Sequence, residues 1–224
     1  MRPRLWLLAG PNGSGKSSLV STGVFAALTN TPEHPDELLR INPDQAAAAL
    51  RADRADLSPD ALALEAAQRS DAQLDEAIIE RRPVLVETVL SSDKFIERVD
   101  RATAAGYWIG LVFMLLQHPG INVMRVAARV AQGGHDVPED RIRARWSRSL
   151  MRLPVFARRA NSFWVLDNSV KQGPARLLAE RSAKSRYVSD LATALIADSE
   201  AEPLLREVLQ EIVDLIGEAD PAPR

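Results

Sequence analysis

The chain has 224 residues, a formal net charge of −2 and no cysteine. This length suits one large α/β domain, and the charge gives the chain no general attraction for nucleic acid. Without cysteine, the chain can have no disulfide, no thiolate nucleophile and no cysteine-based metal site.

The apolar runs of the chain are short. The longest one, residues 108–116, is far shorter than a membrane span of roughly 20 residues. The first apolar strand begins at Leu5, which leaves no room for a signal peptide before it. We therefore expect a cytoplasmic protein with no membrane or nucleic-acid partner.

The first predicted strand, residues 5–9, leads into a glycine-rich loop and a helix over residues 17–28. The loop fits G-x-x-x-x-G-K-[ST], the phosphate-binding P-loop. Its residues are Gly10, Pro11, Asn12, Gly13, Ser14, Gly15, Lys16, Ser17 and Ser18. Loop N–H groups and a helix N-terminus together form an anion site, so we expect ATP here. Lys16 is predicted to reach the β- and γ-phosphates, and the Ser17 hydroxyl to bind Mg²⁺; the alternative is a chance Gly/Ser turn.

Four further apolar runs alternate with helical segments and predict strands over residues 38–41, 84–87, 108–116 and 163–166. This alternation predicts a P-loop NTPase/kinase fold: a five-stranded parallel sheet with helices on both faces. Ligands of such sheets bind at the carboxyl ends of the strands. We expect a kinase core over residues 1–170, with a lid at about 119–160, and a helical C-terminal extension of the same domain over 171–224.

Asp44 follows the second predicted strand in the string Asn-Pro-Asp. In this place an aspartate can orient a substrate hydroxyl beside the γ-phosphate and accept its proton. The alternative is a helix N-cap, because aspartate before a run of alanine is a strong cap signal. Spacing alone does not decide between these two hypotheses.

Glu87 ends the third predicted strand and points toward the same crevice. It can bind substrate hydroxyls or hold a magnesium-bound water, in place of the missing Walker-B aspartate. The alternative is an ion pair with a nearby arginine. Ser91 and Ser92 are predicted to cap the next helix, residues 93–105.

The segment from residue 119 to 160 holds nine Arg, no Lys and three acidic residues. Arginine is the side chain that binds phosphate in a bidentate manner. Arg125 and Arg129 share one helix face. A second helix, after a break at Gly133-Gly134, carries a stripe of Arg141, Arg145, Arg148 and Arg152. Two such helices suit a lid over a triphosphate, and a solvated surface is the alternative. His118, before this segment, is interpreted as a turn residue.

Five strings occur in order over about residues 5–170: GPNGSGKSS, INPD, VETVLSS, RVAARVAQGGHDVPEDRIRARWSRSL and VLDNS. Together they resemble the zeta-toxin-like small P-loop kinases of bacteria. The resemblance implies a kinase that moves the γ-phosphate of ATP to a hydroxyl of a small molecule. Zeta toxins act on UDP-N-acetylglucosamine, and relatives act on other nucleotide sugars or nucleotides. The resemblance also implies an antitoxin protein as a partner to look for.

The resemblance carries roles onto individual residues. It implies that Lys16 binds phosphate, that Asp44 is the base, and that Glu87 and Thr88 face the substrate. Arg125 or Arg129 would stabilise the transferring phosphoryl group. Larger zeta toxins have a second phosphate-binding arginine in the turn before the second lid helix. Here that turn is Gly133-Gly134-His135, so His135 or a stripe arginine such as Arg145 must substitute.

Two other function classes fit the P-loop. A mechanical or regulatory ATPase would need an LSGGQ-like signature or a strand ending in Asp-Glu, and a GTPase would need an NKxD motif; none occurs in the sequence. A nucleotide-binding module without catalysis would have no need of an aspartate at position 44. The sequence therefore favours a small-molecule kinase.

Overall fold

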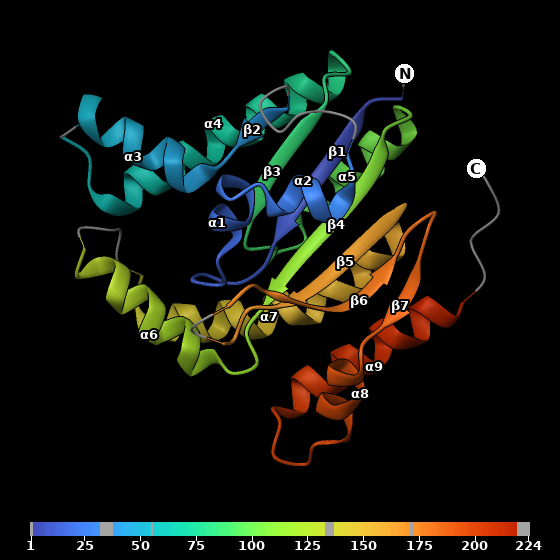
Figure 1. Cartoon of the computed structure of the whole chain (residues 1–224). Helices are drawn as coiled ribbons and strands as arrows, with labels where there is room; N and C mark the ends of the chain where they lie inside the picture. The colour runs from blue at the N-terminus through green and yellow to red at the C-terminus, as the bar shows by residue number, and fades with distance from the viewer. Residues whose placement is uncertain (1, 32–37, 55, 133–136, 171–172, 219–224) are drawn as a thin grey trace.

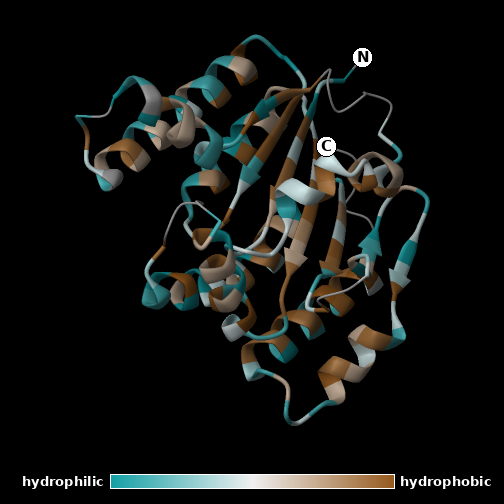
Figure 2. Cartoon of the chain, turned by 60° about the vertical axis from the view of Figure 1, so that its left-hand side comes forward, coloured by the Kyte–Doolittle hydropathy of each residue, from teal (hydrophilic) through white to brown (hydrophobic). Residues whose placement is uncertain are grey.

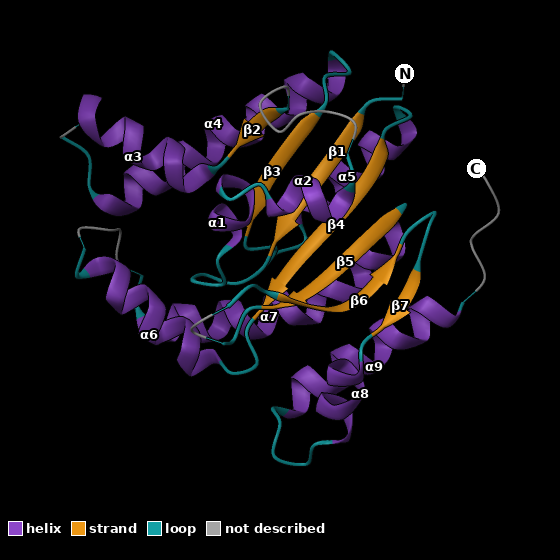
Figure 3. Cartoon of the chain, in the orientation of Figure 1, coloured by secondary structure: helices purple, strands orange, loops and turns teal. Residues whose placement is uncertain are grey.

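A computed structural model of the chain describes residues 2–31, 38–54, 56–132, 137–170 and 173–218. Its described strands form one sheet of seven strands in the order β2-β3-β1-β4-β5-β6-β7 (Figure 3). The strands are β1 (Arg4–Ala9), β2 (Leu39–Ile41), β3 (Val84–Thr88), β4 (Trp108–Leu115), β5 (Ser162–Asp167), β6 (Arg176–Arg181) and β7 (Arg186–Val188). The α/β fold class is confirmed.

The first five strands are parallel, as predicted, whereas β6 and β7 are antiparallel. The prediction of five strands is therefore wrong in number, and the chain after residue 173 is not purely helical. The sequence of β6, Arg-Leu-Leu-Ala-Glu-Arg, consists of good helix formers. Pairing with the edge of β5 overrides that propensity. Among the described residues, β7 and then the helices α8 (Asp190–Ala197) and α9 (Pro203–Gly217) follow.

Helices cover both faces of the sheet (Figure 1). On one face, α5 (Lys94–Ala104), α7 (Glu139–Arg159) and α9 pack in the larger apolar cluster. On the other face lie α1 (Lys16–Ser21) and α2 (Val24–Thr29), which pack against Trp6 and its aromatic neighbours. The predicted single helix over residues 17–28 is thus two helices, because Gly23 has φ 74° and interrupts it. The central strands are mostly apolar, as the brown ribbon in Figure 2 shows.

Two helical pairs lie on opposite sides of the carboxyl ends of the strands (Figure 1). One pair is α3 (Pro43–Asp53) and α4 (Pro59–Ile79), which share a small apolar cluster of their own. The other pair is α6 (Pro119–Val130) and α7. Since α1 begins between them, these two pairs flank the P-loop. In the part of the chain that the structure describes, no helix is both long and apolar enough to cross a membrane.

Candidate active site

The P-loop runs from the end of β1 to the first turn of α1 and is packed tightly against β4. A Cβ on Gly10 would lie 2.1 Å from the carbonyl oxygen of Met114, and Gly10 has φ 139°. Gly15 has φ 96° and stands directly before the helix. Only glycine tolerates these positions. The sequence therefore folds into an anion-binding loop at a helix N-terminus, as the motif predicts.

Lys16 turns back onto its own loop. Its Nζ donates to the carbonyl oxygens of Gly10 at 2.8 Å and Pro11 at 3.1 Å. Burial lowers the pKa of Lys16 from 10.5 to about 8; the carboxylates of Asp44 and Glu87 oppose this effect, and the charge of Arg129 adds to it. The lysine thus lies within electrostatic reach of three of the predicted site residues.

Glu87 makes the arginine ion pair that was one of its two alternatives, and it also bonds the P-loop. Its Oε2 accepts a hydrogen bond of 2.7 Å from Ser17 Oγ, and its Oε1 pairs with Arg40 at 3.2 Å. The side chain is only 5% exposed. The adjacent Thr88 hydroxyl accepts from the backbone N–H of Leu90 at 3.0 Å and so forms a local turn.

Asp44 does not cap its helix. The N-cap of α3 is Asn42, whose side chain accepts from the backbone N–H groups of Asp44 and Gln45. The cap alternative for Asp44 is therefore wrong, because Asn before a proline at the first helical position is the better cap. The Asp44 carboxylate is exposed. Among the described residues it has no hydrogen-bond or ion-pair partner, and its charge raises the pKa of both Lys16 and Arg145 against the effect of burial.

Helix α6 packs directly on the P-loop. A Cβ on Gly13 would lie 3.2 Å from the Asn122 carbonyl oxygen, and Asn122 Nδ2 donates to the Asn12 carbonyl oxygen at 2.5 Å. The two predicted arginines of α6 diverge. Arg125 donates to the Val170 carbonyl oxygen at 3.4 Å, beyond β5, whereas the charge of Arg129 acts on Lys16.

The arginine stripe of α7 also diverges. Arg141 pairs with Asp60 at 3.6 Å, and Arg152 with Asp93 at 2.9 Å. Arg145 alone among the stripe residues bonds the P-loop, through Asn12 Oδ1 at 3.3 Å. Long side chains that share a helix face can reach different elements, so a stripe in sequence need not form one charged surface. His135, with Gly133 and Gly134, lies outside the described residues.

Two further local predictions near these helices have different outcomes. The N-cap of α5 is Asp93, with no side-chain cap bond, so the predicted caps Ser91 and Ser92 are wrong. His118 caps α6, because its Nδ1 accepts from the Gly120 N–H at 2.9 Å. The prediction of a turn role for His118 is therefore confirmed.

Three polar side chains near the P-loop were given no site role by sequence reasoning: Asn122, Asn168 and Arg40. Asn168, directly after β5, donates through Nδ2 to the Ser14 carbonyl oxygen at 2.8 Å. Asn122 is completely buried on α6. An asparagine on an otherwise apolar helix face was the one signal that could have found it.

The donor set of this site fits a nucleotide with Mg²⁺. Among the described residues, no group of three metal-binding His, Cys, Asp or Glu side chains occurs. Mg²⁺ in proteins commonly takes one or two side-chain oxygens and completes its shell with phosphate and water. The Ser17 hydroxyl and the Glu87 carboxylate, joined by their hydrogen bond at a helix N-terminus, are such a pair.

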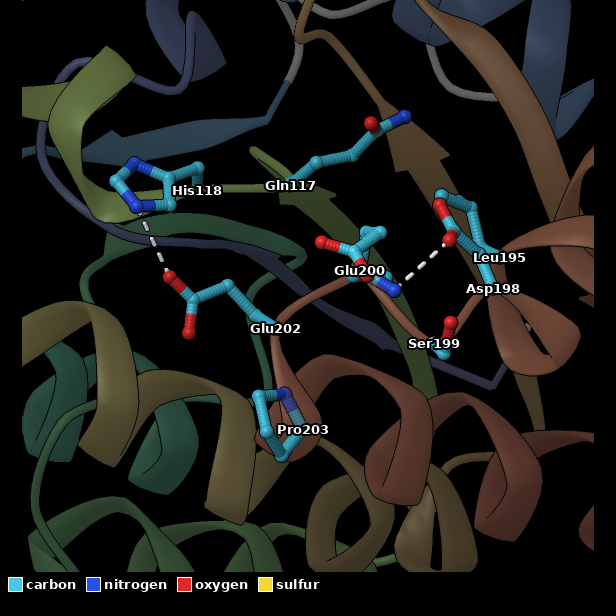
Figure 4. A pocket seen from close by; sticks show the side chains of 9 residues that line it. Gln117, His118, Leu195, Asp198, Ser199, Glu200, Glu202 and Pro203 are labelled. Carbon is cyan, nitrogen blue, oxygen red and sulfur yellow. Dashed lines mark hydrogen bonds and ion pairs between the residues drawn. The ribbon is translucent and has the colours of Figure 1, made fainter.

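A separate hollow of about 490 Å³ lies where the start of α6 meets the loop between α8 and α9 (Figure 4). Gln117, His118 and Glu202 are among the residues that line it, and His118 Nε2 pairs with Glu202 at 3.0 Å. None of the P-loop residues lines this hollow. The phosphate site and this hollow are therefore distinct.

Known proteins resemble the chain in sequence and in structure. The family model of the Zeta toxin matches residues 1–181. An uncharacterized protein of Haemophilus influenzae is 27% identical over 154 residues, which cover 65% of this chain and 99% of that protein. The solved AvrRxo1-ORF1:-ORF2 complex in its native form has a TM-score of 0.64 at 15% identity, covering 98% of this chain and 81% of that chain.

A second solved structure gives the same fold. The structure of the PezAT chromosomal toxin–antitoxin system of Streptococcus pneumoniae has a TM-score of 0.60 at 13% identity, covering 97% of this chain and 88% of that chain. The family model covers more than half of the chain, including every predicted site residue. The chain therefore belongs to the zeta toxin family and has the fold of a P-loop kinase.

Proposed function

We propose that the protein is a cytoplasmic kinase that transfers the γ-phosphate of ATP to a hydroxyl group of a nucleotide sugar or a related nucleotide. UDP-N-acetylglucosamine is the first acceptor to test, because the motifs of the chain resemble zeta toxins. Family membership supports a phosphotransferase. The acceptor class is the part that the proposal adds.

The observation that carries the proposal is the position of the Asp44 carboxylate. It is exposed and unpartnered among the described residues, and its charge acts on both Lys16 and Arg145. An unpartnered carboxylate whose charge acts on a phosphate-binding lysine and on an arginine can accept a proton from an attacking hydroxyl. A protein that only binds nucleotide would gain nothing from it.

The remaining residues divide the work of an in-line transfer. Lys16 and the loop N–H groups bind the β- and γ-phosphates, and Arg129 and Arg145 neutralise charge on the transferring group. Ser17 and Glu87 would hold Mg²⁺, which would supply charge neutralisation to the phosphates. The acceptor oxygen forms a bond to the γ-phosphorus, the bond to the β–γ bridging oxygen breaks, ADP leaves, and the hydroxyl proton moves to Asp44.

Solved structures of the same fold agree with this proposal. The AvrRxo1-ORF1:-ORF2 pair has also been solved with ATP, at a TM-score of 0.61 to this chain. The PezAT structure is that of a toxin–antitoxin system. By analogy, we include an antitoxin protein in the proposal as a partner. Co-expression with the product of a neighbouring gene, followed by size-exclusion chromatography, tests this part separately.

The first prediction concerns the P-loop lysine. Lys16→Ala should abolish ATP turnover, because the variant removes the charge that faces the β- and γ-phosphates. Its far-UV circular dichroism spectrum should match that of the wild type, since Lys16 bonds only loop carbonyls in the structure. Turnover at the wild-type rate would exclude this P-loop as the phosphate site.

The second prediction concerns the base. Asp44→Asn should bind ATP normally but lose transfer by roughly 10²-fold or more, the usual scale for a general base. The experiment incubates the protein with labelled ATP and a panel of nucleotide sugars and nucleotides, and follows the labelled product by chromatography. Equal rates for the variant and the wild type would remove Asp44 from the mechanism. A panel in which no acceptor gains phosphate would refute the proposed acceptor class.

A further inference from the structure

Asn12 is a junction between the P-loop and both helices of the α6–α7 pair. From α6, Asn122 Nδ2 donates to the Asn12 carbonyl oxygen at 2.5 Å. From α7, Arg145 donates to Asn12 Oδ1 at 3.3 Å. Asn12 is 6% exposed and Asn122 is fully buried. The main chain and the side chain of one loop residue are thus held by two different helices.

The loop backbone next to Asn12 is held by close packing against α6. Gly13 has φ 75°, and a Cβ there would lie 3.2 Å from the Asn122 carbonyl oxygen and 3.4 Å from the Arg125 Cβ. Helix α6 therefore leaves the loop no room to turn at this point. The peptide of Asn12 is anchored by Asn122, and the side-chain Oδ1 of Asn12 is directed at Arg145.

Arg145 differs from the first and last arginines of the stripe. Arg141 and Arg152 pair with carboxylates at the surface. Among the described residues, Arg145 has no ion-pair partner, and its bond to Asn12 is its one hydrogen bond. Burial lowers the pKa of Arg145, and Asp44 opposes that effect. A partly desolvated guanidinium beside a P-loop, held by a neutral amide, retains its full charge for an anion.

We propose that Asn12 positions Arg145 on the γ-phosphate of bound ATP. Asn12 is then a positioning residue, and the Asn12–Arg145 pair distinguishes a nucleoside triphosphate from a diphosphate. The inference rests on the proposed function, since it assigns Arg145 to the phosphate that is transferred. An amide is suited to this task because it orients the guanidinium without neutralising it, which a carboxylate would do.

A double-mutant cycle on nucleotide affinity tests the proposal without any acceptor. The dissociation constants of AMP-PNP and ADP, each with Mg²⁺, are measured by calorimetry for the wild type, Asn12→Ala, Arg145→Ala and the double variant. Each single variant should lower the preference for AMP-PNP over ADP by roughly tenfold, the scale of one hydrogen bond to a charged group. The double variant should be no worse than Arg145→Ala, because Asn12 acts through Arg145.

A matched control lies two residues away on the same helix. Arg143 pairs with Glu139 at 2.7 Å on the exposed side of α7, so Arg143→Ala should leave the preference for AMP-PNP unchanged. Asn12→Asp provides a second probe if Asn12→Ala fails to fold. It should form an ion pair with Arg145, and so weaken AMP-PNP more than ADP.

Three outcomes would overturn the inference: equal weakening of AMP-PNP and ADP by Asn12→Ala, additive effects in the double variant, or an unchanged preference in Asn12→Asp. These outcomes are distinct from a failure of the proposed function. If the nucleotide preference changes as expected while no hydroxyl acceptor is ever phosphorylated, the kinase proposal fails and the role of Asn12 stands.

Discussion

At the scale of single residues, the pKa of Lys16 should differ between the nucleotide-free and the nucleotide-bound protein. Without nucleotide, its ammonium bonds the carbonyl oxygens of Gly10 and Pro11. These bonds do not offset the cost of burial, so the pKa of Lys16 is lowered to about 8. Bound phosphates would raise this pKa again, since an opposite charge favours the ammonium form.

This difference predicts the pH dependence of catalysis. The value of kcat/KM for ATP reports the free enzyme and should fall as pH rises through about 8, because Lys16 then loses its charge. The value of kcat at saturating ATP should stay level over the same range. Lys16→Arg provides the control, since arginine stays charged throughout. A wild-type kcat/KM without an inflection near this pH would contradict the lowered pKa.

The same lowered pKa affects stability in the opposite sense. Between the folded pKa of about 8 and the ordinary value of 10.5, the unfolded chain binds more protons than the folded one. The free energy of unfolding contributed by Lys16 therefore rises with pH across this window. Nucleotide-free protein should gain stability over the range in which it loses affinity for ATP.

At the scale of elements, the start of α3 carries a structural residue, the cap Asn42, and a proposed catalytic residue, Asp44. Asn42→Ala removes the cap that accepts from two backbone N–H groups and should cost about 1 kcal/mol of stability. Asp44→Ala should cost less, because Asp44 only interacts with the helix dipole. Thermal melting and phosphate transfer measured on both variants should therefore rank them in opposite orders. A larger loss of stability in Asp44→Ala would restore the cap hypothesis.

The predicted lid includes helix α7, whose middle packs in the core. Trp146 Nε1 donates to the Leu116 carbonyl oxygen at 2.8 Å, and Trp146 and Leu150 lie in the main apolar cluster. These contacts anchor the middle of α7 to the sheet. The role of α6 and α7 as a lid over nucleotide stays a prediction.

The P-loop and the five parallel strands could be predicted because their signals are local. A glycine loop between an apolar run and a helical stripe has few other interpretations, and α/β alternation implies a parallel sheet. The helix break at Gly23 and the strand β6 were not predicted, because both depend on tertiary contacts. The sequence of β6 favours a helix, and only the free edge of β5 makes it a strand.

The sequence predicts which residues lie near the site, but not which partner each arginine side chain contacts. Lys16, Asp44 and Glu87 follow strands whose carboxyl ends meet, so their proximity follows from the topology. The divergence of Arg125 from Arg129, and of Arg141 from Arg145, depends on where each long side chain finds a partner. The partner of each arginine lies on an element distant in sequence, so no local sequence pattern predicts it.

At the scale of the whole molecule, the C-terminal elements are part of the core although the family model ends at residue 181. Helix α9 buries Leu205, Leu209 and Ile212 in the same apolar cluster as α7 and the strands. Arg181 itself, the last residue of β6, lies between these elements. Its guanidinium stacks on the Phe163 ring, with 5.0 Å from Cζ to the ring centroid.

Arg181 therefore joins the family-matched part to the rest of the chain. It donates to the carbonyl oxygens of Ala157 in the last turn of α7 and of Leu215 in the last turn of α9, each at 3.2 Å. Such carbonyls lack partners within their own helix, and a cation also favours the negative end of each helix dipole. One buried side chain thus satisfies two helix ends that would otherwise lack donors.

Arg181→Leu keeps the apolar contact with Phe163 but leaves both helix ends without this donor. The expected cost is about 3 kcal/mol of unfolding free energy, the scale of hydrogen bonds to a charged group that is buried. Urea denaturation measures it, and Arg158→Leu, which removes an exposed pair with Glu218, is the control that should stay within about 0.5 kcal/mol of the wild type. Since Arg181 is remote from the P-loop residues, the folded variant should retain its affinity for ATP. Equal stability of the two variants would mean that the C-terminal helices are held by apolar packing alone.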